Sequence, residues 1–246
     1  MSSALWISLS GASSRLQELD VVSNNLANAD TVGFKRAQLV FSSVLETAVA
    51  DLDVGPARGA PGRVFPGTDA GGLDLSIGPI APTGGGLDVA IEGPGFFEVE
   101  TLDGPRYTRA GAFVVGAAGV LATPAGDPVV GEGGPIAVAS GPARILGSGE
   151  VVDAAGTVLG RLKLVGFETA DALEPEGGNL FRVRPGSVQE DLAEPRFAEA
   201  SLERSNVRPV EELAGLVLLQ RSFDTSMRAL QSEDESSRRL IEELSR

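Results

Sequence analysis

Apolar residues recur at helical spacing at both ends of the chain and lose that spacing in the middle. Near the N-terminus they step by alternating fours and threes, and the same step returns near the C-terminus. This spacing is typical of a helix with one narrow apolar stripe, which is hidden only against other helices. We therefore expect two helices that pack together and against neighbouring copies. The stripe positions are Leu5, Leu9, Ala12, Leu16, Leu19, Ser23 and Leu26, then Leu213, Leu216, Gln220, Phe223, Met227, Leu230, Asp234, Ser237, Ile241 and Leu244.

Polar residues interrupt the second stripe and leave two interpretations open. Asp234 and Ser237 are typical of a solvated helix end. Gln220 either lies in solvent or fixes the register of a helix interface, as a buried polar group does in coiled coils.

The first helix is predicted to end within an Asn-rich segment. Asn25 and Asn28 compete with helical hydrogen bonds, and Gly33 supplies a positive φ at little cost. We expect these residues to shape the helix end and Phe34 to anchor it in an adjoining groove. A β-branched residue at Gly33 should then redirect the next residues without changing the melting of the folded domain, because the segment is expected to lie outside it.

The middle of the chain carries β signals. Residues 51–86 hold five prolines among many glycines, which favours an extended linker. Beyond Leu87, apolar and charged residues alternate as in half-buried strands, for example Leu162 and Leu164 around Lys163. Pro209 stands where a first-turn proline belongs and predicts the start of the last helix.

These patterns predict an α+β fold with N- and C-terminal α-helices forming a coiled-coil-like helical domain around a central antiparallel β domain. The expected parts are residues 1–50 with the first helix and Asn-rich loop, the linker 51–86, the β-rich outer domain 87–200, and the C-terminal helix in 201–246.

The composition argues against an enzyme. The chain has no histidine and no cysteine, so the usual general base and metal ligands are missing. The glycine-rich stretches match neither phosphate-binding spacing, no Gly-x-Ser-x-Gly elbow occurs, and acidic pairs such as Glu98 and Glu100 fit the outer face of a strand. We expect no catalytic residue, no metal and no cofactor. A cell-wall hydrolase, and an adhesin or binding module with a coiled-coil stalk, remain the alternatives.

The formal charge of −14 is concentrated in the middle of the chain. Residues 51–201 hold ten basic and 21 acidic residues, a balance that repels nucleic acid and suits a solubilising outer face, with a basic partner left open. No apolar run reaches the roughly 20 residues of a membrane span. The first nine residues lack the basic and apolar regions of a cleaved secretory signal.

Three ordered motifs resemble those of bacterial flagellar rod and hook proteins. The first is Asn24-Asn25-Leu26-Ala27-Asn28 with Thr31, Gly33, Phe34 and Lys35. The second is the block Leu87 to Phe97, followed by Tyr107-Thr108-Arg109, Gly111 and Phe113. The third comprises Ser205-Asn206-Val207 and Gln220-Arg221-Ser222-Phe223-Asp224. The length, Gly134-Pro135-Ile136 and the segment Gly160 to Phe181 look most like the proximal-rod type, with the distal-rod type as the alternative.

The resemblance implies a structural subunit of the flagellar drive shaft. Such a subunit is exported by the flagellar type III apparatus without a cleaved signal, and polymerises in the periplasm with copies of itself and other rod proteins. Its helices form the inner tube and its β domain lies outside. The expected assembly interface is Leu5, Leu9, Leu16, Leu19, Asn25, Leu26, Asn28, Gly33, Phe34, Leu213, Leu216, Gln220, Phe223, Met227 and Leu230.

Overall fold

The chain folds into two compact units. The computed structural model describes residues 3–45, 64–138, 141–167, 169–192 and 195–244. The first unit contains helix α1 (Ser3–Ala27) up to Leu26, strands β1 (Ala37–Leu45) and β2 (Val64–Leu73) up to Gly72, and helix α2 (Pro209–Leu244). The second unit contains residues 27–36 and 73–208. The Asn-rich segment beyond Leu26 therefore belongs to the unit that holds most of the strands.

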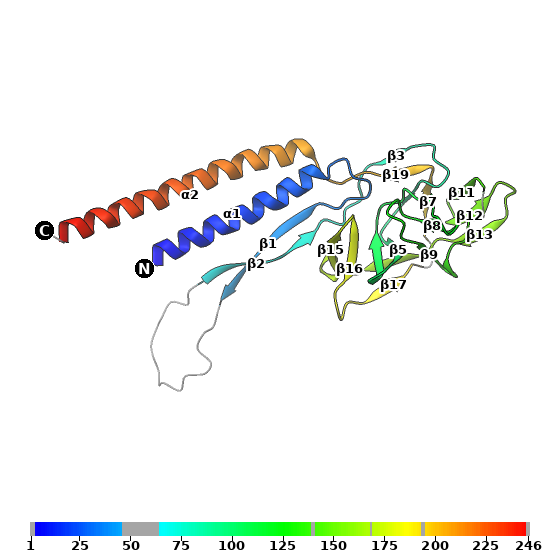
Figure 1. Cartoon of the computed structure of the whole chain (residues 1–246), viewed down its shortest axis with the longest axis horizontal. Helices are drawn as coiled ribbons and strands as arrows, with labels where there is room; N and C mark the ends of the chain where they lie inside the picture. Colours follow the sequence, from blue (N-terminus) through cyan, green and yellow to red (C-terminus); the bar gives the residue numbers. More distant parts are fainter. Residues whose placement is uncertain (1–2, 46–63, 139–140, 168, 193–194, 245–246) are drawn as a thin grey trace, which may run out of the picture. The chain divides into compact units, whose positions relative to one another are not determined.

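The first unit combines long helices with a two-stranded sheet. Both helices run without interruption (Figure 1), and β1 pairs with β2. Pro209 opens α2 and needs no hydrogen bond for its nitrogen there, while Glu211 and Glu212 stand at the positive end of the helix dipole. The predicted start of the last helix is confirmed.

The second unit is built from short antiparallel strands. Its main sheet has the order β10-β9-β5-β6-β16-β15, and β14 pairs with both β5 and β17. These strands are β5 (Phe96–Thr101), β6 (Gly104–Thr108), β9 (Val129–Gly131), β10 (Gly134–Pro135), β14 (Leu164–Phe167), β15 (Leu173–Gly177), β16 (Leu180–Val183) and β17 (Gln189–Asp191).

Smaller sheets and one 3-10 turn complete the second unit. The order β11-β12-β13 makes a three-stranded sheet, and β18-β4, β19-β3 and β7-β8 are pairs. Their bounds are β3 (Ile80–Pro82), β4 (Val89–Ile91), β7 (Val114–Val115), β8 (Leu121–Ala122), β11 (Ala143–Ile145), β12 (Glu150–Asp153), β13 (Val158–Arg161), β18 (Phe197–Glu199), β19 (Ser201–Glu203) and the 3-10 helix η1 (Ala170–Ala172).

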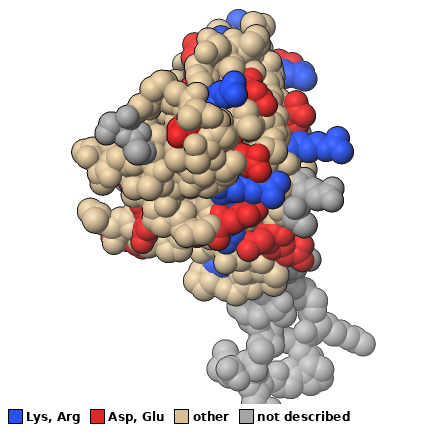
Figure 2. Space-filling view, turned by 90° about the vertical axis from the view of Figure 1, so that its right-hand side faces the viewer, with Lys and Arg blue, Asp and Glu red and all other residues tan. Residues whose placement is uncertain are grey.

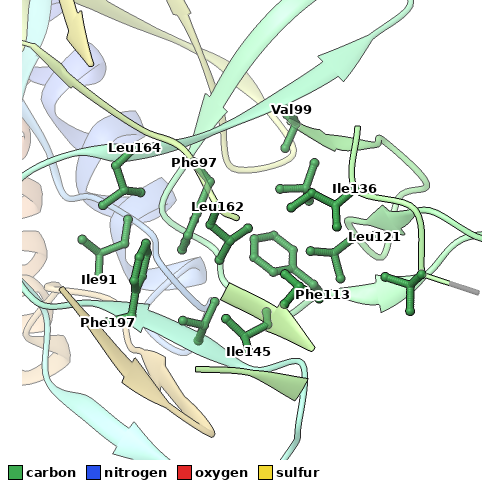
Figure 3. Close-up of a cluster of buried hydrophobic side chains, with 14 residues drawn as sticks. Ile91, Phe97, Val99, Phe113, Leu121, Ile136, Ile145, Leu162, Leu164 and Phe197 are labelled. Atoms are coloured by element: carbon green, nitrogen blue, oxygen red, sulfur yellow. The ribbon is translucent and has the colours of Figure 1, made fainter. Parts of the chain in front are cut away.

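Aromatic and aliphatic side chains from distant strands form the core of the second unit. Figure 3 shows Phe97 between Phe113 and Phe197, and the ring centroids of Phe97 and Phe113 lie 5.0 Å apart in an edge-to-face arrangement. Leu162 and Leu164 point into this core. Lys163, between them, stays partly exposed and pairs with carboxylates. The alternation seen in the sequence is confirmed.

The expected fold class is wrong. The described residues form nineteen strands and only two α-helices, so the protein is mainly β rather than α+β with a coiled-coil-like helical domain. The first reason is that Ala37–Leu45 and Val64–Leu73 form paired strands, the second of them within the segment that was expected to be an extended linker. The second is that the stripe residues Leu16 and Met227 are exposed, whereas a coiled-coil seam is buried.

Charged side chains of both signs lie next to one another on the surface. On the face shown in Figure 2, basic and acidic groups alternate instead of gathering into a patch of one sign. Exposed ion pairs of the second unit include Arg182 with Glu174. Among the described residues, neither helix combines the length and apolar character that crossing a membrane requires.

Candidate functional site

Asn25 joins the last turn of α1 to the first residue of β1. Its side-chain amide donates to the Ala37 carbonyl at 2.9 Å and its carbonyl oxygen accepts from the Ala37 backbone N–H at 2.9 Å. The side chain is buried, so these two bonds satisfy polar groups that have no access to water. Asn25 therefore fixes where the chain turns from helix to strand.

A compact turn follows the helix. The Thr31 backbone N–H donates to the Asn28 carbonyl, the Thr31 hydroxyl donates to Asn28 Oδ1, and the Phe34 N–H donates to the Thr31 carbonyl. Gly33 has φ +68°, in the left-handed region that glycine enters at little cost. The expected positive φ is confirmed. Phe34 is half-buried, and its expected role as an anchor in a groove stays a prediction.

The same turn lies against the strands of the second unit. The Gly33 N–H donates to the Glu203 carbonyl at 2.7 Å, and the Asn179 amide donates to the Val32 carbonyl at 2.6 Å. Asn179 itself has a positive φ of 61° at the β15–β16 turn. The segment is thus a closing element of the β unit rather than a free loop.

Lys35, Arg109 and Glu203 form a buried charge cluster next to Gly33. Lys35 Nζ lies 2.6 Å from Glu203 Oε1, and Arg109 Nη1 lies 3.1 Å from Glu203 Oε2. The side chains of Lys35 and Glu203 are 0% and 1% exposed. Burial lowers the pKa of Lys35 below its ordinary value, while the hydrogen bond that Lys35 donates to Glu203 opposes that shift.

Backbone groups make further hydrogen bonds to this cluster. Lys35 Nζ also donates to the Ser76 carbonyl at 2.7 Å, and the Gly78 N–H donates to Glu203 Oε1 at 2.9 Å. Arg109 Nη2 donates to the Gly93 carbonyl at 2.7 Å. Such additional bonds are what makes a buried ion pair tolerable.

Asn206 ties three separate segments together. Its Oδ1 accepts from the Arg36 N–H at 2.7 Å, and its Nδ2 donates to the carbonyls of Asp74 at 2.8 Å and Ser76 at 3.1 Å. The Asp74 N–H donates to the Arg36 carbonyl at 2.9 Å. The sequence motifs contained Asn206, Lys35 and Arg109, but nothing in the pattern of residues marked Glu203 as their buried partner.

The helix positions expected to form the interface divide into two groups. Leu19, Leu26, Leu216 and Phe223 are half-buried within the chain, whereas Leu16, Leu213, Gln220 and Met227 are exposed. Among the helix residues whose side chains the structure describes, Val22, Asn25, Glu212 and Leu219 are buried. The side chains of Leu5, Leu9 and Leu230 lie outside the described residues.

An outward apolar stripe remains on α2. Val210, Leu213 and Val217 are 79%, 50% and 47% exposed, and their spacing of three and four places them on one helix face. Leu218 beside them is exposed as well. Leu219, which is buried, lies on the opposite side of the helix. Contiguous exposed apolar side chains of this kind mark interaction surfaces.

Comparisons with protein families match three parts of the chain. A family described as "Flagella basal body rod protein" matches residues 5–35, "Flagellar hook protein FlgE/F/G D1 domain" matches residues 90–160, and "Flagellar basal body rod FlgEFG protein C-terminal" matches residues 198–243. The first and last regions contain the Asn-rich turn and α2.

Similar proteins align with nearly the whole chain. The flagellar basal-body rod protein FlgF of Caulobacter vibrioides is 33% identical over 99% of this chain and 98% of its own length. FlgF of Salmonella typhimurium is 34% identical over 100% and 99%. The chain belongs to the flagellar rod and hook protein family. The rod protein FlgG of Bacillus subtilis is 30% identical over 97% of both chains.

Membership of the flagellar rod and hook family makes this chain a structural protein of the flagellar basal-body rod. As a rod component, it assembles with other rod components and with itself.

Proposed function

We propose that this chain is a subunit of the proximal rod and that it polymerises through its two terminal helices. The observation that carries the proposal is the outward stripe Val210, Leu213 and Val217 on α2. Fully burying one such side chain stabilises an interface by about 1.5 to 3 kcal/mol. A neighbouring subunit that covers the stripe would therefore gain several kcal/mol from these side chains, partly offset by the entropy lost on association.

The edges of the main sheet argue against polymerisation through the β unit. The outer strand β15 carries Glu174, Pro175 and Glu176, and the edge strand β17 is exposed and polar along its length. Charged side chains and proline prevent sheet edges from pairing with another chain. The helices are left as the elements suited to self-association.

The interface would contain both groups of helix positions. Exposed residues such as Leu16, Leu213 and Met227 would contact neighbours directly, while Leu216 and Phe223 would support them from within the subunit. A heterologous contact of this kind repeats without closing and generates a helical filament.

The chain would cross the periplasm as part of the rod, after export by the flagellar type III apparatus without a cleaved signal peptide. It would act as a mechanical element and not as an enzyme, since the family is structural and the sequence lacks histidine and cysteine.

Deletion of the gene tests the assignment to the proximal rod. Basal bodies isolated from the deletion strain should lack both this part of the rod and everything distal to it, and the wild-type gene should restore them. Basal bodies that retain a complete proximal rod and lack only the distal rod would assign the chain to the distal position instead. Complete rods in the deletion strain would refute the proposal.

A further inference from the structure

The chain passes between its two units at four points, and three of them converge on one buried carboxylate. The crossings follow residues 26, 36, 72 and 208. The segments next to three of these crossings contain Lys35, Ser76 and Glu203. The Lys35 ammonium donates to both the Ser76 carbonyl and the Glu203 carboxylate, within the second unit. Asn206 links the same three segments a second time, through hydrogen bonds with the backbone of Arg36 and Asp74.

Burying the three charged side chains of this cluster costs free energy, so its position requires an explanation. Lys35 and Arg109 bring two positive charges against the single negative charge of Glu203, and all three residues are almost fully buried. Taking charges out of water costs several kcal/mol per ion, and hydrophobic residues often stabilise a fold as well or better. A cluster of this kind is therefore weak evidence for stability, but it resists any displacement that would leave a charge unpaired.

We propose that the cluster is a joint that holds the three segments in fixed register and that Lys35 is the positioning residue of the joint. This inference rests on the proposed function, because a subunit that assembles into a rod needs these chain segments to keep a fixed course. Moving residues 33–36 away from β19 would leave the carboxylate of Glu203 with only one of its two cations. It would also remove the hydrogen bond from the Gly33 N–H to the Glu203 carbonyl. Residues 33–36 are thus either fully docked or released, because any intermediate position would leave a buried charge unpaired.

Charge balance predicts how variants of the three residues differ. Lys35→Met keeps the Arg109–Glu203 pair, which is neutral and retains its bond to Gly93. The β unit should therefore stay folded while residues 33–36 lose their anchor. Glu203→Gln leaves two buried cations without a counter-charge and should disrupt the whole unit.

Hydrogen exchange of the purified full-length protein tests the joint. In Lys35→Met, the backbone amides of Gly33 and Arg36 should exchange about 100-fold faster than in wild type. The variant removes the buried ion pair that keeps this segment closed, and local opening sets the exchange rate. Amides of β5 and β6 should stay far more protected than those of Gly33 and Arg36, because they exchange only when the β unit itself unfolds. The control is Lys163→Met, which removes a partly exposed lysine that also pairs with two carboxylates, Glu98 and Asp191, and should leave Gly33 and Arg36 unchanged.

Incorporation into rods provides the second readout. Lys35→Met should be found in isolated basal bodies at no more than about one tenth of the wild-type amount, and Lys163→Met at the wild-type amount. Unchanged exchange at Gly33 and Arg36, or normal incorporation of Lys35→Met, would overturn the inference. Exchange of the β5 and β6 amides as fast as that of Gly33 and Arg36 in Lys35→Met would also overturn it, since Lys35 would then be part of the core and not of a joint.

The outcome separates this inference from the proposed function. If Lys35→Met assembles normally while a charge on the α2 stripe prevents assembly, the joint is refuted and the helical interface stands. If the charge on the stripe has no effect, the proposed interface itself fails.

Discussion

Gly33 lies directly against the backbone of Arg109. A β-carbon added at Gly33 would come within 2.4 Å of the Arg109 carbonyl carbon and 2.5 Å of the Ala110 nitrogen. Gly33 also has φ +68°. The position therefore requires glycine for two reasons, its backbone conformation and the space that its neighbours leave.

Gly33→Ala should destabilise the second unit strongly. The positive φ costs about 1 to 2 kcal/mol for alanine, and the clash adds to it because backbone atoms must move. We expect a total loss of about 3 kcal/mol or more in chemical denaturation. Gly84→Ala is the matched control, because Gly84 has φ +78° with nothing within 4 Å of the added carbon, and it should lose only about 1 to 2 kcal/mol. Equal losses in the two variants would show that the close approach does not matter.

The position of Gly33 in the fold corrects an expectation from the sequence. A substitution at Gly33 was expected to leave melting unchanged because the segment was thought to lie outside the β domain. The premise is wrong, since Gly33 belongs to the second unit and its N–H donates to the Glu203 carbonyl.

Phe97→Ala should remove a central part of the core. Phe97 is fully buried, contacts Phe113 edge to face and stacks on Phe197. Truncating a buried phenylalanine costs about 3 to 5 kcal/mol. Leu102→Ala, at a fully exposed turn position, should change the free energy of unfolding by less than about 0.5 kcal/mol. Denaturant titration of both variants tests this difference, and a loss below about 1.5 kcal/mol for Phe97→Ala would contradict the described core.

Tyr107 provides a pH-dependent signal that no other residue shares, because it is the single tyrosine of the chain. Burial and then the nearby Glu98 raise the pKa of its phenol above the ordinary value of about 10. The folded state therefore keeps this proton at a pH where the unfolded state releases it. The contribution to stability is fully present below about pH 10 and is lost as the pH rises through the folded pKa.

Ultraviolet titration of the phenolate tests this directly. In the folded protein the phenol should ionise at a higher pH than in the urea-unfolded chain. Tyr107→Phe should remove the corresponding loss of stability at alkaline pH. A titration curve that is the same in the folded and unfolded protein would contradict the burial of Tyr107 and its hydrogen bond to Gln189.

Local patterns in the sequence predicted several elements well. The start of α2 at Pro209 and the alternation around Lys163 depend on neighbours in the chain, and both were confirmed. The β1–β2 sheet was missed because Pro66 and several glycines disfavour strands locally, and pairing between distant segments outweighs that preference.

The buried cluster of Lys35, Arg109 and Glu203 could not have been predicted from local patterns in the sequence. Lys35 and Glu203 lie 168 positions apart, so their contact depends on the complete fold and not on any local period. Lysine and glutamate are seldom fully buried, which makes solvent the default expectation for both. For the same reason, the sequence did not reveal which side of α2 is covered by the chain itself and which side remains exposed.

The most direct test of the account is the incorporation of Val217→Asp into rods. Val217 is half exposed, so the variant should fold normally in circular dichroism and melting experiments. In an interface, the unpaired carboxylate would cost several kcal/mol, so the variant should be present in cells and absent from isolated basal bodies, with loss of motility. Thr225→Asp adds the same negative charge at another exposed position of α2 and should assemble normally. If Val217→Asp enters basal bodies as well as Thr225→Asp does, the outward stripe of α2 is not the assembly interface.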